Sequence, residues 1–337
     1  MIRDVIRKKI LVLDGAMGTM IQKYNLGEAD FRNSTDLFSE DLSKLEKPLK
    51  GNNDLLSLTR PDVIREIHLA YLAAGADIIE TNTFSSTTIS QADYGTESLV
   101  YDINYHSARI AKEVANEYSL KDLNKPRFVA GSIGPTNQTA SMSPDVNNPA
   151  FRVVDFNDLR KAYFEQCQAM LDGGVDAFLI ETIFDTLNAK AAIFAAMEVN
   201  EVNNTDVPIM ISATITDKSG RTLSGQTLQA FLISIEHAKP LSVGLNCAFG
   251  AEQLLPYIKE ISETYDGYVS VYPNAGLPNE FGAYDQTAQI MQDKVKPFFE
   301  LGLVNMVGGC CGTTPDHIKA IVDLAEAYSP RQIEILV

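Results

Sequence analysis

Three cysteines stand where they could bind one metal ion together. Cys310 and Cys311 are adjacent, between an apolar run that ends at Val307 and a helical pattern that starts at Pro315. Cys247 follows another apolar run in the same way. Unpaired backbone N–H groups and the helix dipole at such a position favour the thiolate over the thiol. Three thiolates in equivalent places predict a metal site with one open coordination position.

Zinc is the metal that these residue types indicate, because thiolates are soft ligands and Zn²⁺ binds them tetrahedrally. The amide oxygen of Asn274 is a candidate fourth ligand when no substrate is bound, and a water molecule would serve as well. The residues alone leave two other interpretations open: Cys310 and Cys311 could be a redox pair, or all three cysteines could be buried core residues. Cys167 lies within a helical pattern and is expected to be a small core residue.

Eight short apolar runs are the strands expected to position these cysteines. Most are continuously apolar and rich in Val and Ile, which is typical of strands buried on both faces. The runs are Ile10–Leu13, Ala76–Ile79, Arg127–Ala130, Ala177–Ile180, Pro208–Ser212, Ser242–Leu245, Tyr268–Tyr272 and Val304–Val307.

Amphipathic helical patterns separate the runs, and glycines such as Gly75 and Gly174 are expected to end helices just before the next strand. The helical patterns are Pro61–Ala74, Ser98–Tyr118, Asn157–Leu171, Asn188–Asn200, Leu228–Ala238, Ala251–Tyr265, Thr287–Leu301 and Pro315–Tyr328. Strand–helix alternation repeated eight times predicts an α/β fold, a (β/α)8 TIM barrel, as a single domain over residues 1–337. A doubly wound open sheet is the alternative, although it usually has fewer units and a Gly-rich phosphate loop.

Polar residues collect where the predicted strands end. They are Asp14, Glu80, Thr83, Glu181, Asn246 and Asn274. A closed barrel brings these residues around one mouth, which is the face where barrel enzymes build their sites. Two long loops, Met20–Arg60 and Gly134–Val154, fall on the same face and are expected to serve function rather than to be ordinary surface insertions.

Composition excludes several classes of function. The chain has 337 residues, of which 21% are charged, and its net charge of −16 disfavours nucleic acid and anionic membrane partners. No apolar run approaches the ~20 residues of a membrane span, and the first residues lack the apolar core of a signal peptide. Four cysteines in so long a chain predict a reducing, cytoplasmic location. The four histidines lie within helical patterns and are not expected to bind metal.

Several motifs at the strand ends together carry a family resemblance. They are Leu13–Thr19, Gly51–Asp54, Ile79–Phe84, Gly134–Asn137, Ile180–Thr182, Gly244–Cys247, Pro273–Gly276 and Gly308–Gly312. The chain resembles the homocysteine-binding module of cobalamin-dependent methionine synthases over nearly its whole length. The resemblance implies a zinc-bearing barrel, part of a 5-methyltetrahydrofolate–homocysteine S-methyltransferase, that converts homocysteine to methionine.

The resemblance also implies roles for individual residues. Cys247, Cys310 and Cys311 would hold Zn²⁺, and homocysteine sulfur in the fourth position would lose its proton and take a methyl group from methylcobalamin. Asp14 and Glu181 would bind the substrate's ammonium group. Backbone N–H groups of Gly15, Ala16, Met17, Gly18 and Thr19 would form a nest for its carboxylate. Thr83 and Asn246 are expected to contact the substrate or to support residues that do.

The three cysteines alone do not identify the methyl donor. Betaine– and S-methylmethionine–homocysteine methyltransferases share the barrel and its three cysteines, whereas the Gly51–Asp54 and Gly134–Asn137 motifs favour the cobalamin enzyme. The chain ends at Val337, so folate, cobalamin and reactivation modules are expected in a missing C-terminal part or in separate chains. A zinc- or thiol-binding storage or sensor protein is the non-enzymatic alternative.

Overall fold

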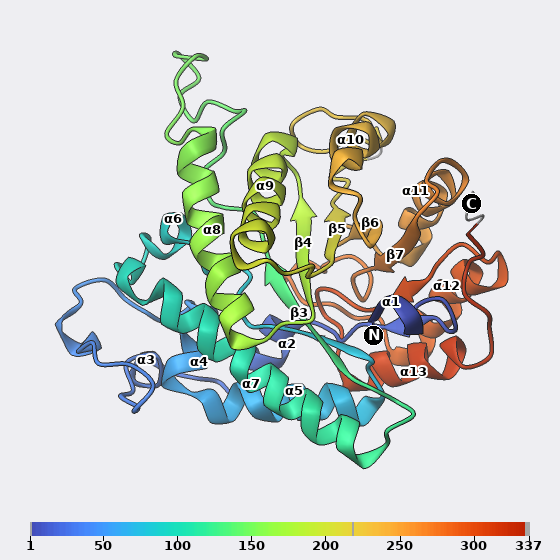
Figure 1. Cartoon of the computed structure of the whole chain (residues 1–337), viewed down its shortest axis with the longest axis horizontal. Coiled ribbons are helices and arrows are strands. Elements are labelled where there is room, and N and C mark those ends of the chain that lie inside the picture. The colour runs from blue at the N-terminus through green and yellow to red at the C-terminus, as the bar shows by residue number, and fades with distance from the viewer. Residues whose placement is uncertain (1, 218, 334–337) are drawn as a thin grey trace.

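Eight parallel strands form the centre of the structure (Figure 1), a computed structural model that describes residues 2–217 and 219–333. The strands are β1 (Leu11–Val12), β2 (Ile78–Glu80), β3 (Phe128–Ile133), β4 (Ala177–Ile183), β5 (Ile209–Ala213), β6 (Ser242–Asn246), β7 (Tyr268–Tyr272) and β8 (Met306–Val307). Each pairs with the next strand of the chain from β2 to β8, and β8 pairs with β1. All eight predicted strands are present, with ends shifted by at most three residues.

The first and second strands meet and close the ring. Leu13 forms a parallel bridge with Ile78. The backbone N–H of Asp77 donates to the carbonyl of Val12 over 2.7 Å, and that of Asp14 donates to the carbonyl of Ile78 over 2.9 Å. The predicted (β/α)8 TIM barrel is therefore confirmed, and the alternative of an open doubly wound sheet is wrong.

The eight predicted helices surround this ring (Figure 1). They are α5 (Pro61–Ala74), α7 (Val100–Lys121), α8 (Phe156–Gly173), α9 (Thr186–Asn203), α10 (Leu228–Ile235), α11 (Ala251–Thr264), α12 (Ala288–Glu300) and α13 (Pro315–Ala325). Gly75 ends α5 with φ 106°, and Gly174 ends α8 with φ 93°, so both adopt the left-handed conformation that glycine tolerates best. Thr314 caps α13, and Pro315 is its first residue, where the helical pattern predicts the start.

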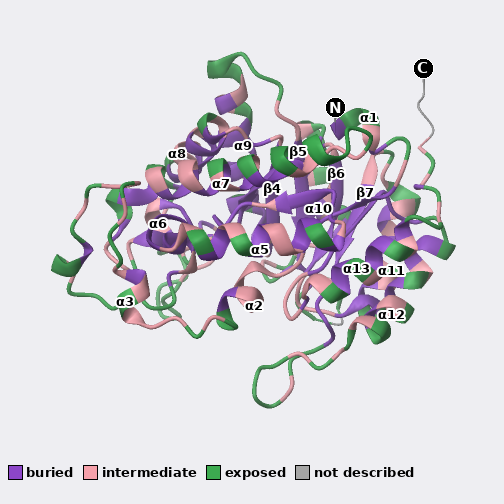
Figure 2. Ribbon diagram, turned by 90° about the horizontal axis from the view of Figure 1, so that it is seen from below, coloured by how far each residue is buried: buried purple, intermediate pink, exposed green. Residues whose placement is uncertain are grey.

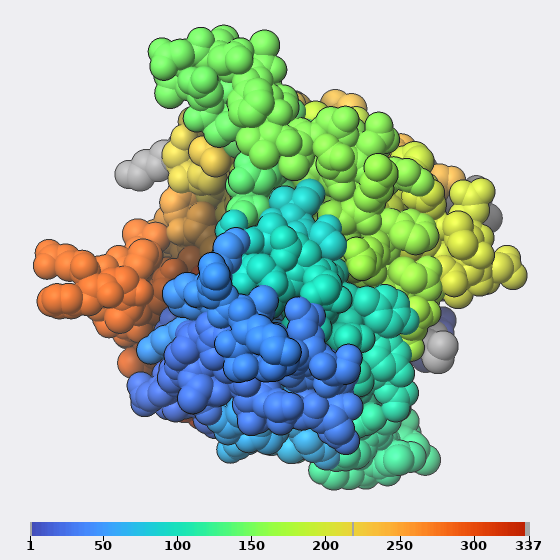
Figure 3. Space-filling model, turned by 90° about the vertical axis from the view of Figure 1, so that its left-hand side faces the viewer, coloured from blue at the N-terminus to red at the C-terminus, as the bar shows by residue number. Residues whose placement is uncertain are grey.

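The long segment 20–60 contains short helices that its sequence pattern does not predict. These are α3 (Glu28–Phe31) and α4 (Leu56–Thr59), with the 3₁₀ turns η1 (Leu42–Lys44) and η2 (Asn53–Leu55). The short elements elsewhere in the chain are α1 (Ile2–Val5), α2 (Met17–Gln22), α6 (Thr88–Gln91), η3 (Glu97–Leu99) and η4 (Glu236–Ala238). Helices of four to six residues are stabilised by tertiary packing rather than by periodicity. Residues 134–154 contain no helix or strand, and they project from the surface together with a loop near residue 280 (Figure 3).

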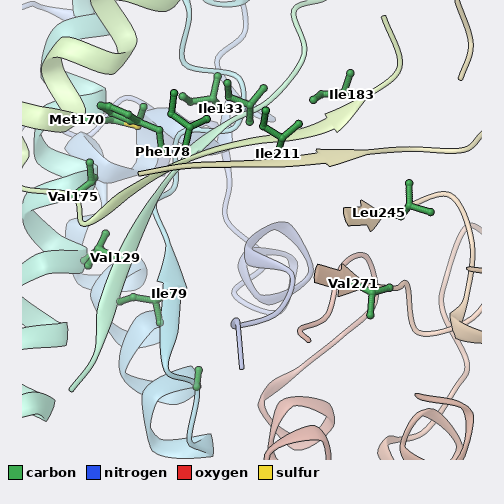
Figure 4. Close-up of a cluster of buried hydrophobic side chains, with 14 of the residues drawn as sticks. Ile79, Val129, Ile133, Met170, Val175, Phe178, Ile183, Ile211, Leu245 and Val271 are labelled. Carbon is green, nitrogen blue, oxygen red and sulfur yellow. The ribbon is translucent and has the colours of Figure 1, made fainter. Parts of the chain in front are cut away.

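Two layers of core lie on either side of the strands. Phe178 and Ile180 of β4 point outward into a cluster that packs against the helices, part of which is shown in Figure 4. Ala177 and Leu179 belong to a second cluster that also contains Ile6. This alternation is that of a barrel strand buried on both faces, and Figure 2 shows the strands as the most deeply buried part of the chain.

Within the described residues, no helix combines the length and apolar character needed to cross a membrane.

Candidate active site

The three predicted metal ligands come together at one place. The Sγ atoms of Cys247, Cys310 and Cys311 all lie within 4.8 Å of one another. Those of Cys247 and Cys311 are 3.8 Å apart, and none of the three cysteines is in a disulfide. Zn–S bonds of about 2.3 Å in tetrahedral geometry place two sulfurs about 3.8 Å apart. The donor set and its spacing therefore fit a zinc ion.

Cys247 owes its position to an unusual backbone turn directly after β6. Cys247 and Ala248 have φ values of 61° and 56°, so two consecutive residues other than glycine are left-handed. The N–H of Phe249 donates to the carbonyl of Cys247 over 2.6 Å and closes the turn. Such conformations are sparsely populated, and they persist only where the surrounding structure holds them. The turn directs the thiol toward the loop that follows β8.

The loop that carries Cys310 and Cys311 is anchored on two sides by backbone hydrogen bonds. Gly309 donates to the carbonyl of Asp14 over 3.1 Å, and Cys310 donates to that of Pro273 over 2.9 Å. The carbonyl of Cys311 accepts from Ala275 over 2.9 Å. Both thiols are thus fixed against the ends of β1 and β7. A Cβ atom on Gly309 would lie 2.6 Å from the Thr313 hydroxyl, so the close approach requires glycine.

The three thiols do not have equal proton affinities. Hydrogen bonds from Cys247 and Cys310 hold the pKa of the Cys311 thiol well below its ordinary value, while burial opposes the shift. Hydrogen bonding to its two neighbours raises the pKa of Cys310, and burial adds to this effect. The cluster therefore favours one thiolate shared among three sulfurs, and a cation would be needed to stabilise all three as thiolates.

A cavity of about 600 Å³ lies beside the sulfurs, within the range of about 300–1,000 Å³ that is typical of small-molecule sites. All three cysteines line it, together with residues from the loops after β1, β2, β3 and β4 and with Tyr272, the last residue of β7. Its acidic lining residues are Asp14, Asp54, Glu80, Asp93 and Glu181. No lysine, arginine or histidine is among the described residues that line it. The cavity is therefore suited to a ligand with a cationic group.

Three of these carboxyl groups, those of Asp14, Glu80 and Glu181, form a cluster in which Asp14 and Glu181 are buried and Glu80 is partly exposed. The Oδ2 atom of Asp14 accepts from the backbone N–H of Glu80 over 3.1 Å, and Glu181 accepts a hydrogen bond from the hydroxyl of Ser132. The Oδ1 atom of Asp14 is buried and has no hydrogen-bond partner. Burial raises the pKa of Asp14 and Glu80 well above their usual values, and it raises the pKa of Glu181 to about 7. A cationic group of a ligand would donate a hydrogen bond to the unpartnered Oδ1 atom of Asp14, and its positive charge would stabilise the carboxylates.

The predicted nest at Gly15–Thr19 is the start of helix α2. The N–H groups of Met17 and Gly18 lie in its first turn, where an α-helix provides no acceptor of its own, and both residues line the cavity. Ala16 instead donates to the hydroxyl of Thr313 over 3.1 Å. The Thr19 hydroxyl accepts from the N–H of Gly312 over 3.0 Å, so this side chain holds the cysteine loop. Thr19 is not among the residues that line the cavity.

The remaining predicted residues take different positions. Thr83 lines the cavity, but its hydroxyl donates to the carbonyl of Ser132 over 2.7 Å, so it supports the wall. Asn246 is fully buried and does not line the cavity, which argues for support rather than for direct contact with a ligand. Asn274 is buried, and its Oδ1 atom has no hydrogen-bond partner. An orphaned amide oxygen in the segment after β7 is consistent with the predicted role as a metal ligand.

Two side chains at the cavity, those of Asp54 and Tyr272, were given no role from the sequence. Asp54 accepts from the N–H of Ser85 over 2.6 Å and from the hydroxyl of Ser86 over 2.9 Å, and burial raises its pKa to about 6. The hydroxyl of Tyr272 is buried without a partner. Both residues line the cavity. Their positions at the end of the Gly51–Asp54 motif and at the last residue of β7 are the signals that could have identified them.

The sequence profile of the homocysteine S-methyltransferase family matches residues 11–325. The chain belongs to this family. The match covers every strand and every main helix, and it confirms the resemblance to homocysteine S-methyltransferases.

Solved structures of the Escherichia coli homocysteine methyltransferase MmuM have the same fold. Its oxidised form superposes with a TM-score of 0.70 at 21% identity, covering 93% of this chain and 95% of that one. Its metallated form superposes with a TM-score of 0.69 at 22% identity, covering 94% of this chain and 96% of that one. Its apo form superposes with a TM-score of 0.66 at 20% identity, covering 95% of this chain and 97% of that one. At this identity the likeness establishes the fold alone.

Proposed function

We propose that this family member transfers a methyl group to the sulfur of homocysteine at a zinc ion held by Cys247, Cys310 and Cys311. The observation that carries the proposal is the meeting of three thiol sulfurs within 4.8 Å at the wall of an acidic cavity. Zn²⁺ bound there would act as a Lewis acid that lowers the pKa of an added thiol. Three thiolates would surround the ion with more negative charge than neutral ligands would, which would preserve the nucleophilicity of the added sulfur.

The amino-acid end of homocysteine would be bound by the carboxyl cluster and by α2. The unpartnered Oδ1 atom of Asp14 and the carboxylate of Glu181 would accept hydrogen bonds from the ammonium group. The free N–H groups of Met17 and Gly18, at the positive end of the helix, would donate to the carboxylate. This arrangement needs no basic side chain, which agrees with the lining of the cavity.

We propose methylcobalamin as the methyl donor, carried by another module or chain that takes its methyl group from 5-methyltetrahydrofolate. The support is the Gly51–Asp54 and Gly134–Asn137 motifs, which favour cobalamin-dependent methionine synthases by resemblance. Residues of both motifs, among them Asn53 and Asn137, line the cavity beside the cysteines. A donor at the cavity mouth would therefore meet these residues. The cobalamin- and folate-binding modules would be partners of this chain.

A small cationic donor, betaine or S-methylmethionine, is the second candidate. Five acidic residues line the cavity, and no basic residue is among those described there, so an ammonium or sulfonium compound would be attracted electrostatically. Both candidate donors leave the role of the cysteines unchanged. They differ only in which molecule fills the cavity outside the homocysteine subsite.

Methionine formation tests the donor directly. Zinc-loaded protein would be incubated with L-homocysteine and, in separate reactions, with methylcobalamin, betaine or S-methylmethionine. We expect turnover with methylcobalamin, and turnover with an onium donor alone would establish the second candidate. The test should be made under reducing conditions, because the four free cysteines fit the reducing cytoplasm that we propose as the protein's location.

Calorimetry separates an enzyme from a thiol- or zinc-storage protein. A substrate site should distinguish L-homocysteine from L-cysteine, because the carboxyl cluster and the thiols set the length of the ligand. A storage site has no reason to discriminate between the two. Equal affinities for both amino acids, without methionine formation from any donor, would rule out the proposed function.

A further inference from the structure

The side chain of Asn246 is fixed in one orientation beside the thiol of Cys310. It is the last residue of β6, and it is fully buried. Its Oδ1 atom accepts from the backbone N–H of Thr182 over 3.0 Å and from the hydroxyl of Ser212 over 2.7 Å. A backbone N–H can only donate, so the atom facing Thr182 must be the amide oxygen. The amide nitrogen must therefore point the other way.

The amide nitrogen of Asn246 faces one oxygen and one sulfur. Nδ2 donates to the hydroxyl oxygen of Thr182 over 2.7 Å, and it lies 3.9 Å from the Sγ atom of Cys310, within reach of a hydrogen bond to sulfur. Each of its two hydrogens thus has an acceptor. The second acceptor, the sulfur of Cys310, belongs to a predicted metal ligand. Cys247, which follows Asn246 in the chain, is another predicted metal ligand.

The backbone is strained at residues next to the Asn246 amide, and this strain helps to form the hydrogen bonds of the amide. Thr182 has φ 54°, which is an outlier for a β-branched residue, and it lies within an irregularity of β4 between Ile180 and Ile183. That conformation lets Thr182 present both its N–H and its hydroxyl to Asn246. Cys247 and Ala248 are left-handed as well. Backbone outliers that cluster at a site are a reason to look for a positioning role.

We propose that Asn246 is a positioning residue for the metal centre, which donates a hydrogen bond from its amide to the Cys310 sulfur and is held in that orientation by Thr182 and Ser212. The inference deepens the proposed function, since it assumes that the three thiols bind a metal ion. Hydrogen bonding to a thiolate withdraws negative charge from the sulfur and fixes its direction, and such contacts tune both affinity and the electronic character of the ion.

Cobalt substitution gives a readout that does not depend on methyl transfer. Co²⁺ bound to thiolates has sulfur-to-metal charge-transfer absorption, whose energy falls when a hydrogen bond to sulfur is lost. In Asn246→Ala protein loaded with Co²⁺ we expect this absorption at longer wavelength than in the wild type. Competition with a chelator should show about 10- to 100-fold weaker metal binding.

Asn305 provides a matched control. It is equally buried, and it precedes β8 at the opposite end of the barrel. Its Oδ1 atom accepts from the N–H of Val269 over 3.0 Å, and its Nδ2 atom donates to the carbonyl of Arg331 over 2.9 Å. Asn305→Ala should lower stability without moving the absorption. An equal shift in both variants would mean that loss of any buried amide perturbs the centre, and it would overturn the proposal.

Two variants of Thr182 keep the proposal testable if Asn246→Ala does not fold. Thr182→Ser retains the hydroxyl, so the charge-transfer absorption of the Co²⁺-loaded variant should match that of the wild type. Thr182→Ala removes the acceptor that orients the amide, and it should shift the absorption in the same direction as Asn246→Ala. Unchanged absorption in both Asn246→Ala and Thr182→Ala, with metal affinity retained, would refute the role. Absence of thiolate absorption from wild-type protein with Co²⁺ would instead refute the proposed metal site.

Discussion

The Sγ atoms of Cys247 and Cys311 lie 3.8 Å apart although 64 residues separate them in the chain. Each belongs to a loop that starts where a strand ends, β6 in one case and β8 in the other. Closure of the barrel, rather than a local sequence motif, therefore creates the ligand set. Because the backbone on both sides of the pair is hydrogen-bonded to neighbouring strand ends, the sulfurs are preorganised for an ion.

Removal of one thiol should abolish tight zinc binding. Cys247→Ala leaves two sulfurs, and we expect the zinc content of purified protein to fall from about one ion per chain to near zero. Cys167→Ala is the control, because Cys167 is a free cysteine buried in α8 outside the site. Elemental analysis of both variants after dialysis against a weak chelator makes the comparison. Loss of zinc from the Cys167 variant as well would show that metal content follows stability rather than ligation.

Neutralising Glu181 should weaken homocysteine binding while leaving the metal in place. Glu181→Gln loses a charged hydrogen bond to the ammonium group, which corresponds to about 10- to 100-fold in the dissociation constant. The control is Glu198→Gln, since Glu198 pairs with Arg160 on the outer helices. Calorimetry on zinc-loaded protein measures both. An unchanged affinity in Glu181→Gln would remove this residue from the proposed substrate site.

The pH dependence of homocysteine binding should carry the signature of the same carboxyl group. Burial raises the pKa of Glu181 to about 7, so the carboxylate that attracts an ammonium group forms as the pH rises through that value. Wild-type affinity should therefore increase between about pH 6 and pH 8. In Glu181→Gln this increase should be smaller. A titration that is identical in both proteins would assign the effect to the substrate thiol.

Much of this site could be predicted because barrel strands end on one face. Cys247, Cys310 and Asp14 are each the first or nearly the first polar residue after an apolar run, so pattern alone places them at the mouth. The barrel itself follows from eight repeats of strand and helix, and the observed bounds differ by few residues.

Features that depend on packing across the barrel could not be predicted in the same way. Nothing local indicates that Thr182 is left-handed, because its conformation is fixed by the amide of Asn246, 64 residues away. The sequence likewise left open whether Asn246 contacts the substrate or supports residues that do, because its hydrogen bonds to β4 and β5 and its complete burial depend on packing across the barrel. The contact of Asp54 with Ser85 and Ser86 is equally non-local.

A methyl group at Gly244 should destabilise the barrel. Its Cβ atom would lie 1.9 Å from the carbonyl oxygen of Ser270 on the neighbouring strand, and a backbone atom cannot move aside easily. We expect Gly244→Ala to lower the free energy of unfolding by about 3 kcal/mol or more. At Gly27 the nearest atom is 4.0 Å away, so Gly27→Ala should cost no more than about 1 kcal/mol. Urea unfolding of both variants tests the difference, and equal midpoints would contradict the close packing of β6 against β7.

The buried imidazole of His68 should make the fold sensitive to acid. His68 lies in α5 with no exposed surface, and neither of its ring nitrogens has a hydrogen-bond partner. Burial lowers its pKa to about 3, whereas the unfolded chain takes up a proton near its ordinary pKa of about 6.5. The contribution of this group to stability is therefore complete above about pH 6.5, and it is lost by about 1.4 kcal/mol per pH unit as the pH falls toward 3.

Replacement of this side chain by an apolar one should remove that part of the acid sensitivity. Carboxyl groups also titrate in acid, so the informative quantity is the difference in unfolding free energy between wild type and His68→Leu, measured in urea between about pH 7 and pH 5. We expect this difference to move in favour of the variant by about 1.4 kcal/mol for each unit below pH 6.5. His237→Leu, which replaces an exposed imidazole in η4, is the control substitution. A constant difference for His68→Leu would mean that water or a moved side chain solvates the imidazolium, because only a solvated cation could escape the cost of burial.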